Sequence, residues 1–248
     1  QPTYHLRQTV NVSGSLMQDS SPVSDALISI EVRNPREDLL LLRTIPIGNP
    51  LERWAVNITD AYILDSFGNP TEKAVVDSTM RLFITVYNTQ LTQVSGYVTA
   101  TVCDGNLIPI RAAWSPISIS PGSEVSVEWS CYIPEWAYCG IATVHYNVYT
   151  NLPKNQGFPY APEKTIQFYI TRNPELNTKY GLSQNSEVTL PGQYNTTFQV
   201  PPDRYTLPGD YSIYVTGRYK ADLLIFTAYS NTTFNVQSPP CPPQAAFT

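Results

Sequence analysis

The stretch Ala142-Thr-Val-His-Tyr-Asn-Val148 decides the fold class, because its apolar side chains occupy every second position. A period of two directs alternate side chains to opposite faces of an extended strand. The same alternation recurs in three other runs: Leu82, Ile84 and Val86; Val98, Ala100 and Val102; and Val125, Val127 and Trp129. These runs predict an all-β protein.

The segment from residue 51 to 172 carries enough strands for one complete domain. Turns such as Asp104-Gly-Asn106 and Pro121-Gly122 separate its expected strands. About seven short strands in about 120 residues are typical of an immunoglobulin-like β-sandwich. The strands are expected at 54–64, 80–88, 94–103, 107–114, 123–132, 140–150 and 164–171.

The flanking segments, 1–50 and 173–237, are each too short to enclose a core alone. Together they hold about seven strands, again the number in a sandwich. One of them is expected at 186–190, and the last stretch, Leu223 to Val236, is expected to form two strands around Tyr229-Ser-Asn231. We therefore expect two immunoglobulin-like β-sandwich domains, with 51–172 inserted into a loop of an outer sandwich that both flanking segments build. The alternative is a row of small sheets packed in sequence order. Residues 238–248 form a Pro-rich tail.

The composition excludes several classes of partner. Only 14% of the residues are charged, against about 25% in a typical soluble domain. The net charge of −5 argues against nucleic acid and against a polybasic membrane surface. No apolar run approaches the roughly 20 residues of a membrane span, so none is expected in this chain.

Cysteine usage and glycosylation sequons predict an extracellular or cell-surface location. The four cysteines are Cys103, Cys131, Cys139 and Cys241, and none lies in a zinc-type C-x-x-C pair. Cys131 and Cys139 flank one loop, so we expect a disulfide between them, with buried free thiols as the alternative. N-linked glycans are expected at the four N-x-S/T sites, although one or two such sites arise by chance in Thr-rich β proteins. These sites are Asn11, Asn57, Asn195 and Asn231.

The outer segments resemble the macroglobulin-like and related immunoglobulin-like repeats of archaeal surface proteins. The resemblance is carried by V-N-V-S-G-S-L (10–16), P-V-S-D-A-L-I-S-I-E-V-R-N-P (22–35), P-G-Q-Y-N-T-T-F-Q-V-P (191–201) and P-G-D-Y-S-I-Y-V-T-G (208–217). These are patterns of strands and turns. They imply a fold rather than an activity.

The middle segment is similar to the adhesion-type sandwich repeats of the same proteins. It matches in I-T-D-A-Y-I-L-D-S-F-G-N-P (58–70), V-T-A-T-V-C-D-G-N-L-I-P-I (98–110) and I-S-P-G-S (119–123). The last residues, P-P-Q-A-A-F-T (242–248), resemble the opening strand of a polycystic-kidney-disease repeat. Together these resemblances imply a component of a cell surface, a filament or a surface layer.

Candidate catalytic groups are few. The histidines are His5, in the N-terminal segment, and His145, which alternates with Val144 and Tyr146 and is therefore expected to face solvent. Most acidic residues lie in turns, where hydrogen bonding to the backbone explains them. A calcium site at Asp60, Asp65 and Asp77 is an alternative to a structural turn. We expect no catalytic residues, no cofactor and no metal, and hence no enzyme.

Aromatic residues offer one candidate binding surface. Trp136 and Tyr138 lie in the loop between the two cysteines, where they are candidates for an exposed sugar-binding platform or for ordinary packing. Trp129 alternates with Val127 and is expected in the core. The aromatic pair therefore marks a possible interaction site without fixing its ligand.

These observations favour a secreted structural subunit of a filament or surface layer, whose partners are copies of itself or other surface proteins. Its sandwiches would join end to end or by donated strands. The candidate donors are residues 1–16, through Val10 and Val12, and the tail 238–248. The alternative is a carbohydrate- or cell-binding adhesin module of a larger extracellular protein, and a hydrolase is a third hypothesis.

Overall fold

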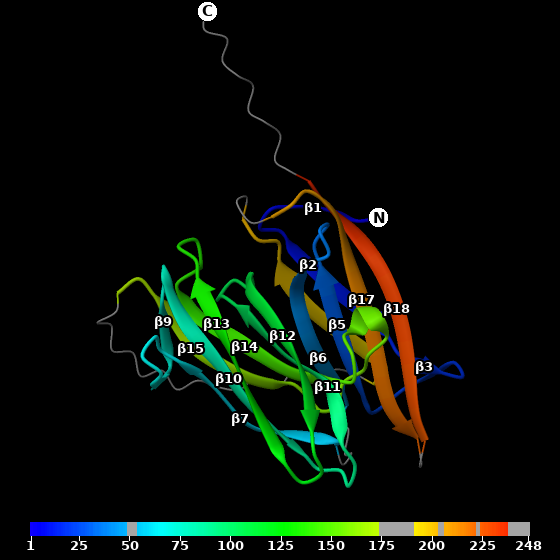
Figure 1. Ribbon diagram of the computed structural model, residues 1–248. Coiled ribbons are helices and arrows are strands. Elements are labelled where there is room, and N and C mark those ends of the chain that lie inside the picture. The colour runs from blue at the N-terminus through cyan, green and yellow to red at the C-terminus, as the bar shows by residue number, and fades with distance from the viewer. Residues whose placement is uncertain (49–53, 174–190, 203–205, 222–223, 238–248) are drawn as a thin grey trace, which may run out of the picture.

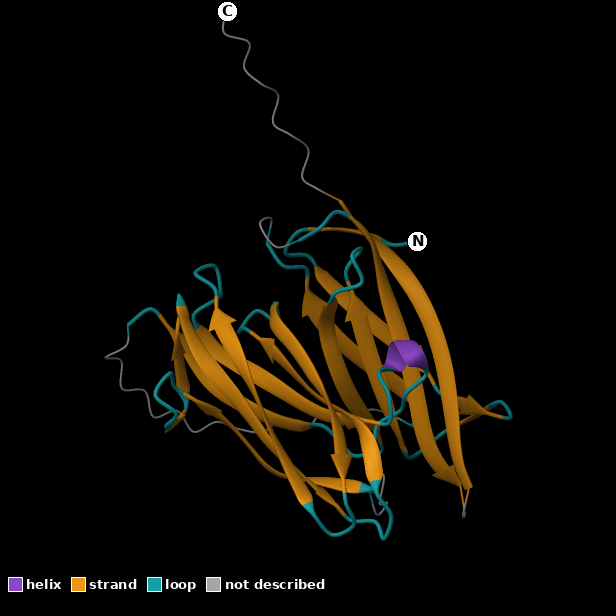
Figure 2. Cartoon of the chain, viewed as in Figure 1, coloured by secondary structure: helices purple, strands orange, loops and turns teal. Residues whose placement is uncertain are grey.

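The protein is all-β, as the alternation predicts. A computed structural model describes residues 1–48, 54–173, 191–202, 206–221 and 224–237 (Figure 1). In these ranges the only helix is the short 3-10 turn η1 (Pro153–Asn155). Figure 2 shows two packed groups of strands lying side by side. A strand expected at 186–190 lies outside the described residues.

Residues 56–171 form two sheets that face each other, here called the central sandwich. Its strands are β7 (Val56–Leu64), β8 (Pro70–Thr71), β9 (Lys73–Val75), β10 (Ser78–Asn88), β11 (Val94–Cys103), β12 (Pro109–Ile119), β13 (Glu124–Ile133), β14 (Gly140–Tyr149) and β15 (Lys164–Thr171). One sheet has the order β13-β10-β7-β8 and the other β12-β11-β14-β15-β9. Neighbouring strands are antiparallel except β9, which is parallel to β15.

Strands from both ends of the chain pair with one another in what we call the terminal sandwich. Its strands are β1 (Thr3–His5), β2 (Thr9–Ser15), β3 (Met17–Gln18), β4 (Ser21–Pro22), β5 (Ala26–Arg33), β6 (Leu39–Ile47), β16 (Gln193–Gln199), β17 (Gly209–Ala221) and β18 (Leu224–Gln237). A five-stranded sheet, β1-β18-β17-β5-β6, faces the two-stranded ribbon β16-β2. The exact domain boundaries, and an immunoglobulin-like topology for each sandwich, stay predictions.

Each sandwich has a hydrophobic core of its own. In the central sandwich the alternating residues of the sequence point inward, with Val98, Val144 and Tyr146 fully buried. In the terminal sandwich the Tyr211 and Phe234 rings stack with their centroids 5.1 Å apart. The period-two pattern therefore identified the inward face of these strands correctly.

The last strand differs from its expected form. The sequence predicted two strands broken near Tyr229, and this is wrong, because β18 runs without interruption from Leu224 to Gln237. It pairs with β17 from Leu224 to Val236, with no shift of register. The turn preference of Ser230-Asn231 is a local tendency, and continuous pairing with β17 overrides it.

Three strands are buried on both faces where the two sandwiches meet. They are β5, most of β11 and most of β14. The terminal edge strand β6 lies against β11, β12 and β14, and η1 lies against β5 and β17 (Figure 1). Polar side chains on the outward faces of these strands are therefore enclosed between the sandwiches rather than exposed.

Candidate functional site

Polar side chains gather where β6 of the terminal sandwich meets the outward face of β14 in the central sandwich. They surround Glu163, which comes just before β15 and whose side chain is only 7% exposed. We call this set the Glu163 cluster. Its members come from both sandwiches: Arg43, Thr44, His145, Asn147, Tyr149, Glu163, Thr165 and Thr196.

The Glu163 carboxylate is enclosed by donors of its own chain. Arg43 Nε lies 3.1 Å from Oε1 and 3.2 Å from Oε2. His145 Nδ1 lies 2.8 Å from Oε1, and the Thr165 hydroxyl donates to the same oxygen at 3.2 Å. The Asn147 amide donates to Oε2 at 3.3 Å. Such a set of partners offsets the cost of burying a charge.

These neighbours keep Glu163 ionised. Burial raises the pKa of the carboxyl, whereas the nearby Arg43 guanidinium and His145 lower it, as do hydrogen bonds from His145 and from the Thr44 main chain. The net effect holds the pKa at about 2, below the usual 4.5. At neutral pH the cluster therefore contains a carboxylate paired with a guanidinium.

The same polar face caps the free edge of the terminal sheet. The Leu42 N–H donates to Thr101 Oγ1 at 3.0 Å, and the Thr44 N–H donates to Glu163 Oε2 at 3.0 Å. The Tyr149 hydroxyl donates to a main-chain carbonyl of β6 at 3.3 Å. An edge strand normally presents unpaired N–H and C=O groups. Here side chains of the central sandwich pair with these three main-chain groups of β6.

A second polar contact joins the sandwiches through the loop 150–163. Glu31 on β5 is fully buried and accepts the Lys154 main-chain N–H at 2.8 Å. Arg218 on β17 donates to the Pro159 carbonyl at 3.2 Å. Its guanidinium also lies 5.4 Å from the centroid of the Trp54 ring, within the range of a cation–π contact.

The position of His145 corrects the sequence interpretation. Its side chain does face away from the central core, but the terminal sandwich covers that face, and the residue is only 6% exposed. The histidine contacts Glu163 rather than solvent. The charged groups of the cluster bind one another, and the Arg43–Glu163 pair holds one sandwich against the other. We call this set of contacts the polar clamp.

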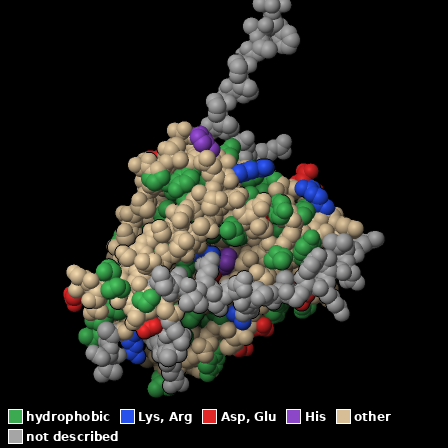
Figure 3. Space-filling view, turned by 180° about the vertical axis from the view of Figure 1, so that it is seen from behind, with side chains coloured by type: hydrophobic (Ala, Val, Ile, Leu, Met, Phe, Trp, Pro, Cys, Tyr) green, Lys and Arg blue, Asp and Glu red, His purple; other side chains and the backbone are tan. Residues whose placement is uncertain are grey.

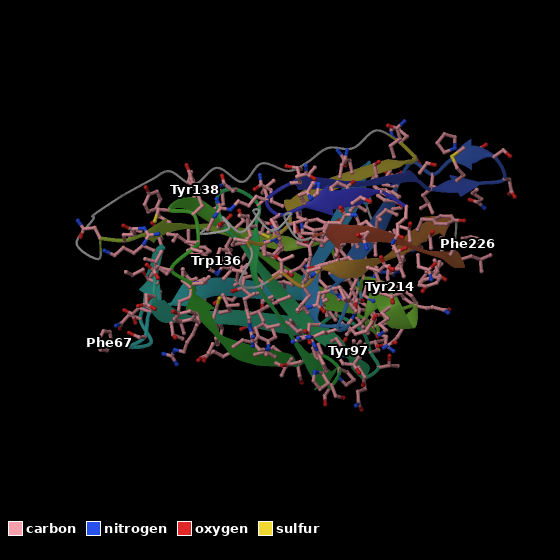
Figure 4. All side chains as sticks on the ribbon, turned by 90° about the horizontal axis from the view of Figure 1, so that it is seen from above. Phe67, Tyr97, Trp136, Tyr138, Tyr214 and Phe226 are labelled. Atoms are coloured by element: carbon pink, nitrogen blue, oxygen red, sulfur yellow. The ribbon has the colours of Figure 1, made fainter. Side chains whose placement is uncertain are left out.

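Trp136 and Tyr138 line a shallow depression of about 360 Å³. Figure 4 shows both side chains on one side of the central sandwich. Tyr138 is 52% exposed, whereas Trp136 is half-buried. Arg7 and Arg172 line the same depression, so a polar or anionic ligand would meet both aromatic and cationic groups. Trp129 packs against the central core, as expected.

The four sequon asparagines are all exposed. Two of them lie on the outward face of the ribbon β16-β2, where Asn11 is opposite Thr197 and Asn195 is opposite Ser13. The two sequons therefore pair with each other across the ribbon. Asn57 lies on β7 and Asn231 on β18.

The expected disulfide between Cys131 and Cys139 is absent from the structure, and both residues are free thiols. Cys131 points into the central core from β13, where it is fully buried, and Cys139 lies partly buried at the end of the loop. Closeness in sequence does not direct two Cβ atoms toward each other, which a disulfide requires. Cys103 is also a free, buried thiol, and Cys241 lies outside the described residues.

Val10 and Val12, the proposed contact residues of a donated strand, lie inside the chain's own terminal core. They are 1% and 6% exposed, and their strand β2 pairs with β16. In this structure β2 is therefore an in-chain strand. The proposed tail donor, 238–248, lies outside the described residues.

The described part of the chain contains no group of three or more His, Cys, Asp or Glu side chains placed to hold a metal ion. Asp65 of the calcium alternative instead accepts two main-chain N–H groups of its own turn at 2.9 Å. Asp77 accepts the Tyr132 hydroxyl. Within the same ranges, no helix combines the length and apolar character needed to cross a membrane.

No protein-family model and no curated protein matches the chain. Among solved structures, Pseudomonas fluorescens alkylpurine DNA glycosylase AlkC is similar at 13% identity and a TM-score of 0.35, over 48% of this chain and 31% of that one. The C-terminal domain of wzt is similar at 11% identity and a TM-score of 0.41, over 54% of this chain and 86% of that one. A Listeria innocua β-glucosidase is similar at 8% identity and a TM-score of 0.34, over 50% of this chain and 16% of that one. This chain thus spans less than a third of the glycosylase and of the glucosidase, and these likenesses carry no conclusion about function.

Proposed function

We propose that this chain is a secreted structural subunit of a cell-surface filament or surface layer, which assembles with copies of itself or with other surface proteins. The observation that carries the proposal is the polar clamp between the two sandwiches. A subunit under load needs domains that do not slide against each other. The Glu163 cluster and the Glu31 contact oppose such sliding, because moving either sandwich would separate the buried Glu163 carboxylate from Arg43 and would break the hydrogen bond from the Lys154 main chain to the buried Glu31.

The surface chemistry supports an extracellular role. All four sequon asparagines are exposed, so glycans on them would project from the folded protein. Charged side chains are scattered among uncharged ones on the face seen in Figure 3. With few charges, hydroxyls, amides and attached sugars would supply much of the surface hydration.

Strand exchange between copies stays part of the proposal, but the structure points to a shorter N-terminal segment as the donated strand. β2 is anchored by Val10 and Val12 in the core, whereas β1 pairs over three residues with β18, from Thr3 to His5. A strand held over so short a length costs little to release. Arg7 and Gln8 form main-chain hydrogen bonds with Val200, so residues 1–6 are a better candidate donor than the whole segment 1–16.

The structural proposal is tested by negative-stain electron microscopy and light scattering of the full chain over a range of concentrations. Fibres or two-dimensional arrays that grow with concentration are the expected result. A particle that keeps the mass of one chain at every concentration, with no fibres, would contradict self-assembly of this chain.

The second candidate function is a carbohydrate-binding adhesin module, and the depression beside Trp136 and Tyr138 favours it. Exposed aromatic faces combined with polar side chains are the usual components of a small-ligand site. Binding of the full chain to a glycan array, lost in Trp136→Ala and retained in Phe67→Ala at a distant exposed loop, would support it. An array without any bound glycan would contradict it.

A further inference from the structure

The two edges of the five-stranded terminal sheet differ in how they are covered. Side chains of the central sandwich cap β6, through Thr101 and Glu163. At the opposite edge, β18 has β1 as its outer neighbour, but only along residues 235–237 (Figure 1). In the part of the chain that the structure describes, residues 224–234 have no strand on their outer side.

The main chain of β18 directs hydrogen-bonding groups toward that open edge. The Asn235 N–H donates outward, to the Pro2 carbonyl at 2.9 Å. In a regular strand, alternate residues point their N–H and C=O groups the same way, and β18 has no register shift against β17. The outward groups therefore belong to Ile225, Thr227, Tyr229, Asn231 and Thr233.

β18 also lacks the features that usually protect an exposed edge. Charged side chains, prolines and bulges discourage pairing with other chains. From Leu224 to Gln237 there is no Lys, Arg, Asp, Glu or Pro. Other long edge strands of this protein do carry such residues: β13 has Glu124 and Glu128, and β12 has Pro109 and Pro116. The contrast singles out β18 as an edge that is free to pair.

The residues of β18 suit pairing with an identical strand. They are rich in Thr, Phe, Ile and Tyr, which favour β-structure. Because none is charged, antiparallel pairing with a second β18 creates no like-charge contacts. Leu224 and Ile225, at the start of the strand, are 65% and 53% exposed, and Figure 4 shows Phe226 at the far end of the molecule. Apolar surface is therefore available where the pairing would begin.

We propose that two copies of this chain pair edge to edge through β18, antiparallel, about a two-fold axis at Tyr229. The two five-stranded sheets then form one continuous sheet. In this register Thr227 of one copy lies opposite Asn231 of the other, and Ile225 opposite Thr233. Five outward residues per copy form pairs with two hydrogen bonds each, about ten in all. This inference rests on the proposed structural function and names the surface that assembles.

Neither β1, which shares this edge, nor a glycan on Asn231 prevents the pairing of two β18 strands. β1 occupies the edge from Asn235 onward, and Gln1 just before it donates to the Thr233 hydroxyl at 3.0 Å. The pairing is therefore limited to residues before Asn235, and Gln1 has to move aside at Thr233. A glycan on Asn231 would stand perpendicular to the sheet, because side chains leave a strand above and below its plane. The hydrogen-bonding groups lie in that plane. Glycosylation therefore does not remove them.

Thr227→Pro in the full chain tests the proposal. Proline removes one outward N–H, and it is tolerated on an edge strand when that N–H does not bond within the sheet. Thr227→Val is the matched control, because it loses the hydroxyl and keeps the main-chain donor. By sedimentation equilibrium we expect the wild type and Thr227→Val to dimerise, and Thr227→Pro to associate about tenfold more weakly or not at all. Circular dichroism should confirm that all three are folded.

Equal association of Thr227→Pro and the wild type would overturn the inference, and so would a wild type that stays monomeric. If Thr227→Pro fails to fold, Thr227→Lys replaces it, since a lysine on the edge also blocks pairing. Fibres that persist in Thr227→Pro or Thr227→Lys would contradict pairing through β18 but would leave the proposed structural function standing. A dimer that Thr227→Pro abolishes, without fibres of the wild type at any concentration, would support the surface and contradict the filament.

Discussion

The Glu163 carboxylate and the Arg43 guanidinium lie 3.1 Å apart although 120 positions separate them in the sequence, and they join the two sandwiches. Both side chains are largely buried, at 7% and 15% exposure. A buried ion pair adds little stability compared with a well-packed apolar pair, but breaking it is costly. Its main effect here is therefore to fix the position of one sandwich on the other.

Glu163→Gln is expected to destabilise the protein by about 3–5 kcal/mol at neutral pH, because it leaves Arg43 buried without a counter-charge. Urea unfolding followed by tryptophan fluorescence measures the change. Glu37→Gln is the matched control. The Glu37 side chain pairs with Lys154 at the surface, where both are more than a third exposed, so its loss should cost less than about 1 kcal/mol. Equal losses in the two variants would contradict the clamp.

The contribution of Glu163 should depend on pH in the acid range. Its pKa is about 2 in the folded protein and near 4.5 when unperturbed, so the unfolded state binds the proton more readily. The stabilisation is therefore complete above about pH 4.5 and is lost as the pH falls toward about 2. The gap in unfolding free energy between the wild type and Glu163→Gln should shrink across that window. A gap that stays constant would contradict the assignment.

The thiols of Cys103 and Cys131 should resist alkylation in the native protein. Burial raises the pKa of each to about 12, which removes the reactive thiolate near neutral pH. Cys139 is partly exposed and should react first with iodoacetamide, as peptide mapping by mass spectrometry would show. The same non-reduced digest should contain no peptide that links Cys131 to Cys139. A peptide that links Cys131 to Cys139 would show that the disulfide predicted from the sequence does form.

The sequence predicted which face of a strand points into the core, but it did not predict which part of the protein covers the opposite face. The alternation through Val144 and Tyr146 identified the core side of β14 and placed His145 on the other side, both correctly. It gave no reason to place a second sandwich against that side. One available signal was Arg43, a charge inside the apolar run that became β6. A lone charge in a buried strand requires a partner, but the sequence does not identify Glu163 as that partner.

Local signals failed where long-range pairing decided the outcome. Ser230-Asn231 has turn chemistry, yet β17 pairs with it continuously and keeps β18 unbroken. The spacing of Cys131 and Cys139 suggested a bridge, yet the direction of Cys131 is set by the core of the central sandwich. In both cases the competing interaction comes from residues distant in sequence, which a single sequence does not align.

The sequon asparagines should tolerate substitution, whereas their inward neighbours should not. Asn195 and Phe198 lie on opposite faces of β16, the first exposed and the second fully buried. Asn195→Gln should change the free energy of unfolding by less than about 0.5 kcal/mol, because the side chain contacts mainly solvent. Phe198→Ala should cost about 3–5 kcal/mol, because it leaves a cavity in the terminal core. Urea unfolding of both unglycosylated variants measures the contrast. A comparable loss in Asn195→Gln would show that this face is covered, and a glycan on Asn195 would then be excluded from the folded protein.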